Sequence, residues 1–282
     1  MKDMDALFES IPEGPKIRFG HSTTKNWSMS SAHFHNYYEL NLSVSGGNRF
    51  FVNDAIHEAR SGDLFFFNDT DLHKNFVPKD LEYERYIILF DPHQVTGLFP
   101  EGDLMYLYSD AMKHLKNRLS LTCDEIIEVT ALLEDVLCHV NGDYEGNTVY
   151  IKLKLCELLL FLTTACKSRS KSETVVKRTS ARIHSILQYI NRNIGSELSI
   201  ERLSEHFYIN KSYLCELFKK ETGLTLNQYI TSKRLLFSKE LLKQGKTVIE
   251  VTGLAGYKND AYFIRLFKKY FGITPKQFAM RQ

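Results

Sequence analysis

The chain has 282 residues, of which 43% are hydrophobic, and a formal net charge of +2. A chain of this length can bury a large core and is expected to form two domains. The five cysteines are scattered without a Cys-x-x-Cys pair, which excludes a disulfide scaffold and predicts reduced thiols. No signal peptide is visible, and the most apolar stretch, Leu155–Cys166, is too short to span a bilayer. We therefore expect a cytoplasmic protein that makes no membrane contact.

The charge is distributed unevenly along the chain. Residues 175–282 carry 19 Lys and Arg against 8 Asp and Glu, whereas the remaining residues carry 17 against 26. A basic C-terminal part joined to an acidic N-terminal part predicts a polyanionic partner for the C-terminal part alone.

Residues 17–90 have the pattern of a small all-β domain. Short aromatic and β-branched runs alternate with turns that are rich in Gly, Asn, Asp and Ser. The runs that suit strands are Tyr38–Val44, Arg49–Val52, Leu64–Phe67 and Tyr83–Phe90. Many short strands at this spacing predict a sandwich or a small barrel, and the interior of such a barrel can hold one small ligand.

Three potential ligating side chains share one parity in this region. Strand alternation places His33, His35 and Glu39 on the same face. The spacing His-x-His-x3-Glu-x6-Gly, with His73 further on, resembles the cupin metal motif. However, the chain has Asn-Asp-Thr-Asp-Leu at 68–72 where the second half of that motif has Pro-x-Gly before its histidine.

We therefore expect a pocket for an organic ligand and no cofactor, and we keep a metal site at His33, His35, Glu39 and His73 as the alternative. The residues expected to bind the effector are His33, His35, Tyr37, Tyr38, Glu39, His73 and Tyr86.

After Pro92 the pattern becomes helical, over Leu104–Leu115, Asp124–Val140 and Thr148–Thr164. The last of these is apolar over more than one face. It either packs against a second subunit, which is the homodimer we expect, or is buried within one chain. Residues 167–180 are polar, Ser/Thr-rich and basic, which predicts a linker between a domain at 1–166 and a domain at 181–282.

The C-terminal part contains one pattern twice, at 208–229 and at 257–278. Ten residues recur at the same offset without a gap: Tyr208, Asn210, Tyr213, Leu217, Phe218, Lys219, Lys220, Gly223, Thr225 and Gln228 match Tyr257, Asn259, Tyr262, Leu266, Phe267, Lys268, Lys269, Gly272, Thr274 and Gln277. In each copy an Asn can cap a helix, a Gly can end it, and a Thr-x-x-Gln capping box can begin the next helix.

Between the copies, Leu226–Gln244 is helical by composition. At 1.5 Å per residue this helix is a rod of roughly 28 Å. Successive major-groove windows on one face of B-DNA lie roughly 34 Å apart, so the rod can hold two short helices in neighbouring grooves. With Ala181–Ile194, Ser199–Phe207 and Val248–Leu254, the C-terminal domain is expected to be all-α with about seven helices.

Residues 183–278 resemble the paired helix-turn-helix domain of AraC/XylS-type transcriptional regulators. The resemblance rests on Ser-Tyr-Leu-x-x-Leu-Phe-Lys-Lys-x-x-Gly at 212–223, on Lys-Arg at 233–234 with Leu-Leu at 241–242, and on the continuous match over 263–278. Residues 21–90 are similar to the cupin-like sensor domain of that family. The resemblance implies an N-terminal domain that binds a small effector and dimerises, and two recognition helices that contact DNA bases.

By that resemblance, eight residues approach DNA bases: Lys211, Ser212, Cys215 and Glu216 in the first helix, and Asp260, Ala261, Ile264 and Arg265 in the second. Arg265 can grip guanine with two hydrogen bonds. Glu216 can accept from cytosine, or it can pair with Lys220 one turn on. Lys219, Lys220, Lys268 and Lys269 suit phosphate contacts.

The sequence thus predicts a non-enzymatic, ligand-responsive transcription factor that activates genes for carbohydrate or small-metabolite use. Its expected partners are double-stranded DNA, a small effector for which we name a sugar, a second copy of the chain, and RNA polymerase. One alternative is a cupin-type metal-dependent enzyme or metal sensor with an accessory helical domain. Another is an N-terminal domain that only dimerises.

Overall fold

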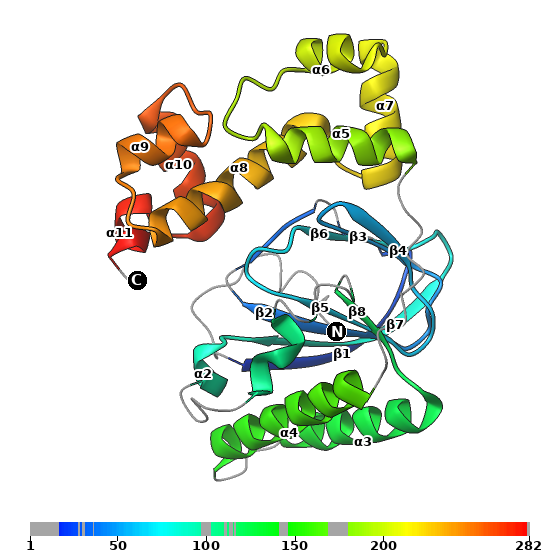
Figure 1. Ribbon diagram of the computed structural model, residues 1–282. Helices are drawn as coiled ribbons and strands as arrows, with labels where there is room; N and C mark the ends of the chain where they lie inside the picture. Colours follow the sequence, from blue (N-terminus) through cyan, green and yellow to red (C-terminus); the bar gives the residue numbers. More distant parts are fainter. Residues whose placement is uncertain are drawn as a thin grey trace.

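The computed structural model describes residues 17–27, 29, 32–35, 37–96, 103–109, 112, 115, 117–140, 146–168 and 180–280. Over these residues a β-rich N-terminal domain is followed by a helical C-terminal domain, which confirms the expected fold class (Figure 1). No helix within these ranges is both long and apolar enough to cross a membrane.

The strands of the N-terminal domain form two antiparallel sheets. The larger sheet has the order β1 (Ile17–Lys25), β7 (Glu82–Phe90), β2 (Tyr38–Ser43), β5 (Asp63–Phe67) and β8 (Arg118–Ser120). The smaller sheet has the order β4 (Ala55–Glu58), β3 (Arg49–Val52) and β6 (His73–Phe76). The four strands expected by residue range are present, each within one residue of its expected ends.

Side-chain alternation gives the larger sheet two different faces. In the register of β2 against β7, Leu40 lies opposite Ile88 and Asn41 lies opposite Ile87. Leu40 and Ile88 join a buried apolar cluster with the helices α3 (Cys123–Val140) and α4 (Asn147–Ser168), which cover this face (Figure 1). The odd-numbered residues of β2 and β7 therefore point the other way, towards the smaller sheet.

The helix expected at Leu104–Leu115 is a 3₁₀ helix over its first residues, and residues 110, 111, 113 and 114 lie outside the described part of the chain. The described part contains the short helix α2 (His93–Thr96) and the 3₁₀ helix η1 (Asp103–Tyr108). Of the expected linker, residues 167 and 168 belong to the last turn of α4, and residues 169–179 lie outside the described part of the chain.

Residues 180–280 form seven helices, as expected. They are α5 (Ala181–Arg192), α6 (Ile200–Phe207), α7 (Lys211–Thr222), α8 (Leu226–Lys243), α9 (Val248–Leu254), α10 (Asp260–Phe271) and α11 (Pro275–Ala279). Helices α6 and α7 form one helix-turn-helix unit, α9 and α10 form the other, and α8 connects them (Figure 1).

The signals read from the sequence fix the ends of these helices. The side chain of Asn210 accepts from the backbone N–H groups of Ser212 and Tyr213, and that of Asn259 accepts from Tyr262. Complete capping boxes begin α8, α9 and α11. Gly223 ends α7 with a φ of 68°, a left-handed conformation that glycine adopts without a Cβ clash.

The smaller sheet lies next to the helical domain, and the two domains share one apolar core (Figure 1). Phe34, Phe51 and Leu72 of the N-terminal domain belong to the same buried cluster as the core residues of the helices. The Phe34 ring lies 5.2 Å from that of Phe271 on α10, and the Phe51 ring lies 6.3 Å from that of Tyr229 on α8. The helical domain is therefore docked on the N-terminal domain.

Candidate functional site

The first candidate surface consists of the outward faces of α7 and α10. The inward faces are buried through Leu214 and Phe218 on α7 and through Phe263 and Phe267 on α10. Of the eight residues expected to approach bases, six are exposed and Cys215 and Ile264 are half-buried; the six are Lys211, Ser212, Glu216, Asp260, Ala261 and Arg265. The repeated pattern thus presents equivalent positions to solvent in both units.

The four lysines assigned to phosphates are also exposed: Lys219, Lys220, Lys268 and Lys269. Lys219 differs from the others because it adjoins the N-terminal domain. Burial lowers the pKa of Lys74 on β6, and the charge of Lys219 lowers it further. Lys211 forms an exposed ion pair with Glu201, at 3.2 Å. Two lysines of α7 therefore already interact with charged groups of the protein, Lys219 with Lys74 and Lys211 with Glu201.

Helix α8 sets the separation of the two units. Its 18 residues give a length of about 27 Å. Leu235, Leu241 and Leu242 of α8 are buried. They belong to the same apolar cluster as core residues of both helix-turn-helix units, so α8 packs against both units. Helix α8 thus fixes the spacing between the two helix-turn-helix units.

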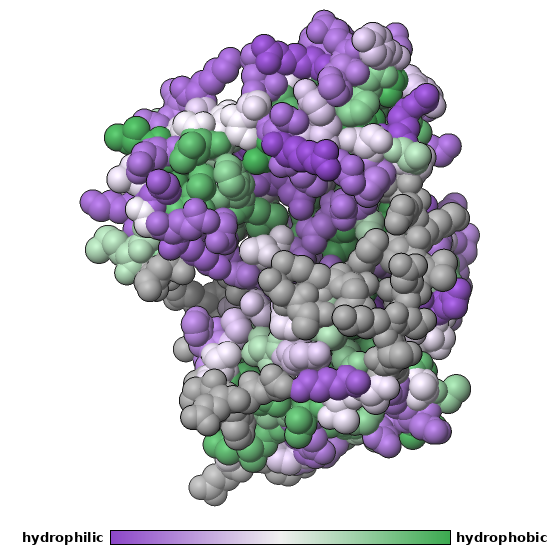
Figure 2. Space-filling model, in the orientation of Figure 1, coloured by the Kyte–Doolittle hydropathy of each residue, from purple (hydrophilic) through white to green (hydrophobic). Residues whose placement is uncertain are grey.

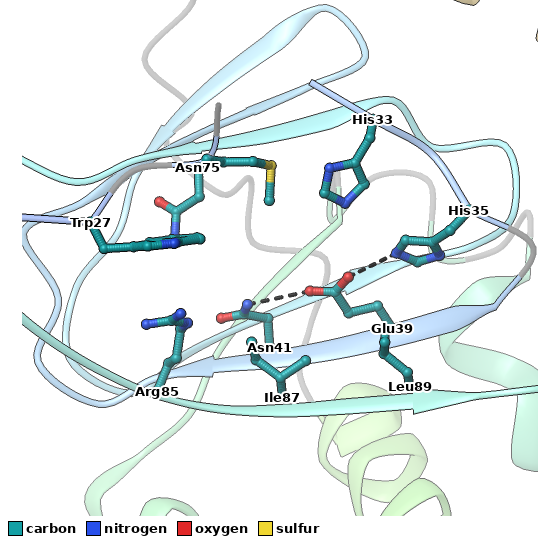
Figure 3. A pocket seen from close by; sticks show the side chains of 10 residues that line it. Trp27, His33, His35, Glu39, Asn41, Asn75, Arg85, Ile87 and Leu89 are labelled. Atoms are coloured by element: carbon teal, nitrogen blue, oxygen red, sulfur yellow. Dashed lines mark hydrogen bonds and ion pairs between the residues drawn. The ribbon is translucent and has the colours of Figure 1, made fainter. Parts of the chain in front are cut away.

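The second candidate site is a cavity between the two sheets of the N-terminal domain (Figure 3). It has a volume of about 50 Å³. Its lining residues are Trp27, Met29, His33, His35, Glu39, Asn41, Asn75, Arg85, Ile87 and Leu89. Pockets that enclose a drug-sized ligand measure roughly 300–1,000 Å³, so this space suits a much smaller occupant in the conformation described.

The cavity contains three of the seven residues expected to bind the effector, namely His33, His35 and Glu39. His73 adjoins it: its Nε2 atom lies 3.5 Å from Glu39 Oε2. Tyr37 contributes only its carbonyl oxygen, which accepts a hydrogen bond from His35 Nδ1 at 2.8 Å. The expected convergence of the two His-x-His side chains with Glu39 is present in the structure.

The expectation that Tyr38 and Tyr86 line this cavity is wrong. Tyr38 packs on Tyr108, with the ring centroids 4.7 Å apart, in the cluster that faces the helical layer. Tyr86 stacks on His21 and donates a hydrogen bond to Glu134 of α3. Both side chains have even parity on strands whose odd residues face the cavity, so they point to the other face of the sheet.

Sequence reasoning missed Arg85 and Asn75. The Arg85 side chain is fully buried, its guanidinium carbon lies 4.3 Å from the Trp27 ring centroid, and it donates to Thr24 Oγ1 at 3.0 Å. Parity along β7 places Arg85 and Tyr86 on opposite faces, but it does not indicate which of the two faces the cavity. Asn75 is linked to Asn48 by a 2.8 Å hydrogen bond across the smaller sheet, which no local pattern indicates.

Glu39 is the electrostatic centre of the cavity. Its burial raises the pKa of the carboxyl, but hydrogen bonds and charges from His35 and His73 outweigh that effect and hold the pKa well below its usual range. Asn41 Nδ2 also donates to Glu39, at 3.3 Å. Glu39 is therefore a buried carboxylate that attracts positive charge.

One segment that lines the cavity, residues 33–35, also contacts the helical domain. Phe34 lies between the cavity residues His33 and His35, and its ring packs against Phe271 and, at 5.8 Å, against Tyr270. These two aromatic residues form the C-terminal end of α10, the helix that carries Arg265. The segment that carries two cavity histidines is thus in direct contact with α10.

Polar contacts hold the same interface. Lys239 of α8, which is buried, lies 2.7 Å from Asp69 Oδ2. Lys74 Nζ donates to the Gly223 carbonyl at 3.1 Å. The Phe76 ring approaches Gly223 so closely that a Cβ there would lie 2.1 Å from Phe76 Cζ. The loop that replaces the second half of the cupin motif therefore contacts α8.

Comparisons with known proteins agree with this architecture. Residues 203–281 match the model of a helix-turn-helix domain, and residues 14–106 match that of an AraC-like ligand binding domain. The multiple antibiotic resistance protein MarA of Escherichia coli is 35% identical over 99 residues, which cover 35% of this chain and 78% of MarA. The HTH-type transcriptional activator RhaR of Mannheimia succiniciproducens is 23% identical over 251 residues, covering 88% of this chain and 87% of RhaR. The melibiose operon regulatory protein of Escherichia coli is 29% identical over 112 residues, covering 39% and 37% of the two chains.

Proposed function

Because the chain belongs to the AraC family of DNA-binding transcriptional regulators, we propose that it is an activator that contacts two successive major-groove segments and responds to a small effector. The observation that carries this proposal is the repetition of one exposed helix face on α7 and α10, at the two ends of the buried rod α8. RhaR, which is similar over most of the chain, is named a transcriptional activator.

We assign base contacts to Lys211, Ser212, Cys215, Glu216, Asp260, Ala261, Ile264 and Arg265, and phosphate contacts to Lys219, Lys220, Lys268 and Lys269. The exposure of ten of these side chains supports the assignment, while Cys215 and Ile264 are half-buried. A phosphate contact positions the protein without reading sequence, whereas a bidentate Arg–guanine pair discriminates between bases.

The effector acts by shifting the population of the docked arrangement. A ligand in the cavity that displaces the His33–His35 segment changes how Phe34 packs on α10. Such a ligand shifts the equilibrium between the docked and the released arrangement only by the difference between its affinities for the two. When the helical domain leaves the N-terminal domain, Lys219 on α7 also moves away from Lys74 on β6. The domains at 1–166 and 181–282, joined by 167–180, are the units that move.

A second copy of the chain is part of the proposal. Val149, Leu153 and Leu160 project from one side of α4 and are 62%, 55% and 57% exposed. Figure 2 shows hydrophobic side chains gathered at the lower end of the view, over the α3–α4 layer of Figure 1. An apolar helix face of this kind suits a symmetric contact between two subunits. A dimer doubles the number of DNA contacts and so raises the effective affinity.

The test is selection of DNA from a random pool by the full chain, followed by affinity measurements on the selected site at several salt concentrations. We expect an enriched site with two conserved segments about one helical turn apart, and affinity that falls steeply with salt. Arg202→Ala serves as the matched control for Arg265→Ala, because Arg202 is exposed on α6 and pairs with Glu197. Equal losses in both variants, or no enriched sequence, would contradict the proposal.

A further inference from the structure

A second cavity lies at the end of β5, on the opposite face of the larger sheet from the first. Phe66 of β5 pairs with Leu40 of β2, and both side chains join the apolar cluster under the helical layer. This second cavity has a volume of about 180 Å³ and shares no lining residue with the cavity of about 50 Å³ between the sheets. Its described lining residues are Phe66, Asn68, Thr70, Asp71, Leu107, Tyr108, Ser109, Met112 and Asn117.

Several hydrogen-bonding atoms of the second cavity have no partner within the described part of the chain. Ser109 Oγ is buried and unpaired. Asn68 uses its Oδ1 atom to accept from Thr70, which leaves its Nδ2 group free to donate. Asn117 uses its Nδ2 group to donate to the Phe66 carbonyl oxygen and to Asp71, which leaves its Oδ1 atom free to accept. Buried polar groups are normally paired, so this cavity suits a polar occupant.

The lining favours a neutral occupant that carries hydroxyl groups. A hydroxyl both donates and accepts, so it can pair with the amide of Asn68, with that of Asn117 and with the Ser109 hydroxyl. Asp71 is the one charged side chain of the described lining, and its charge disfavours an anion. Three donors already compensate that carboxylate, at 2.7, 2.8 and 2.9 Å, so it needs no added cation. The volume is below the roughly 300–1,000 Å³ of sites for drug-sized ligands, which limits the occupant to a small molecule.

The loop at residues 68–71 lines the second cavity and also contacts α8. Within the loop, the Asp69 carboxylate lies 2.7 Å from Lys239 Nζ. The loop keeps its shape through a 2.9 Å hydrogen bond from the backbone N–H of Asn68 to Asp71 Oδ2. A molecule that bonds to Asn68 therefore stabilises the loop conformation in which Asp69 meets Lys239.

A second chain of hydrogen bonds leads from the cavity to α8. Asn53 Nδ2 donates to Asp71 Oδ1 at 2.7 Å, and Asn53 Oδ1 accepts from Lys233 Nζ at 3.1 Å. The carbonyl oxygen of Asn53 accepts from the Tyr229 hydroxyl at 3.2 Å. Lys233 and Tyr229 belong to α8, which connects the two helix-turn-helix units. Two hydrogen bonds thus separate a carboxylate of the cavity from the helical domain.

We propose that the second cavity binds a small, neutral, hydroxyl-rich molecule, such as a monosaccharide or a polyol, and that this molecule stabilises the docked arrangement. The regulatory consequence rests on the function proposed above, whereas the binding itself does not. The loop at residues 68–71 has its partners on α8 only while the helical domain is docked. A ligand that fits the loop in this conformation binds the docked arrangement more tightly than the released one and shifts the equilibrium towards docking.

Binding is tested by calorimetry on the full chain, with aldopentoses, aldohexoses and alditols as neutral probes and with gluconate and glucosamine as charged relatives. We expect one molecule of at least one neutral probe per chain, and weaker binding of the charged relatives. Ser109→Ala removes the unpaired hydroxyl without breaking a hydrogen bond of the chain, and is expected to weaken binding roughly three- to tenfold. Ser185→Ala is the matched control, because Ser185 Oγ donates within α5 to the Ala181 carbonyl, and its binding stays at the wild-type level.

DNA affinity of the same samples tests the regulatory role. A neutral probe that changes the DNA affinity of the wild type, and changes it less in Lys239→Met, supports the site and its role, because this variant breaks the loop contact from the side of α8. A bound probe that leaves DNA affinity unchanged, or changes it equally in Lys239→Met, overturns the role of the loop.

Three results would overturn the site itself: no binding of any neutral probe, tighter binding of a charged relative, or binding that Ser109→Ala does not weaken. Sequence-specific DNA binding in those samples would leave the proposed regulator intact, so the failure of the site and the failure of the proposed function are distinguishable.

Discussion

The buried ion pair between Asp69 and Lys239 is the polar contact expected to contribute most to docking of the two domains. Lys239 Nζ lies 2.7 Å from Asp69 Oδ2 and 3.2 Å from the Asp69 carbonyl oxygen, and its side chain is only 3% exposed. Asp69→Asn removes the negative charge and keeps the shape, so the docked domain retains a buried ammonium group with weaker compensation. The helical domain is then expected to lose the stability that docking gives it.

The magnitude follows from burial. Breaking a buried ion pair by removing one partner costs about 3–5 kcal/mol. The Asp69 side chain is 23% exposed and the backbone carbonyl stays in place, which reduces the expected cost to about 2 kcal/mol in free energy of unfolding of the docked helical domain. For a domain of this size, the melting temperature falls by roughly 10 °C.

Circular dichroism at the helical band, followed on heating, measures this shift in the full chain. Glu201→Gln is the matched control, because it breaks the exposed Lys211–Glu201 pair and is expected to leave the melting temperature nearly unchanged. Adding Lys239→Met to Asp69→Asn removes the uncompensated charge and should restore most of the loss. The electrostatic account of docking is refuted if Asp69→Asn and Glu201→Gln lower the melting temperature equally. It is also refuted if the double variant melts no higher than Asp69→Asn.

Three further outcomes are expected. Arg265→Ala relaxes base preference at one position by roughly 1–3 kcal/mol, whereas Lys268→Ala weakens binding to all sequences and lowers the salt slope by about one; uniform loss from Arg265→Ala would contradict base reading. Tyr208→Gly raises the free energy of unfolding of the helical domain, measured by urea denaturation, by roughly 1 kcal/mol, because Tyr208 is 96% exposed and has a φ of 53°; a lower free energy of unfolding would show that the ring contributes more than the strain costs. Leu153→Arg is expected to convert the proposed dimer to a monomer in light scattering without lowering the melting temperature of the chain; a dimer that persists would exclude this face of α4.

The helical domain was predictable because its signals are local. The caps at Asn210 and Asn259, the left-handed glycines after α7 and α10, and the capping boxes each act within four residues. A helix face repeats every three to four residues, so the buried Leu214–Phe218 and Phe263–Phe267 pairs follow directly from spacing. The same local reasoning gave the strands β2, β3, β5 and β7 to within one residue.

The cavity was only partly predictable, because its composition depends on which face each strand presents. His33, His35 and Glu39 share a parity that can be counted along the chain. Which parity of β7 faces inward follows from its pairing with β2 and β1, which brings together residues far apart in sequence. Tyr86 was therefore assigned to the wrong face, and Arg85 was missed.

The sequence by itself determined that two equivalent basic helix-turn-helix units are joined by one helix, because helix formation and capping depend on near neighbours in the chain. Only the tertiary structure decided that Phe34 links the histidine cluster to the end of α10, and that Asp69 neutralises Lys239 across the interface. Those contacts join residues more than 150 positions apart. The packing of whole domains decides which residues meet in these contacts, and no pattern within a single segment encodes that packing.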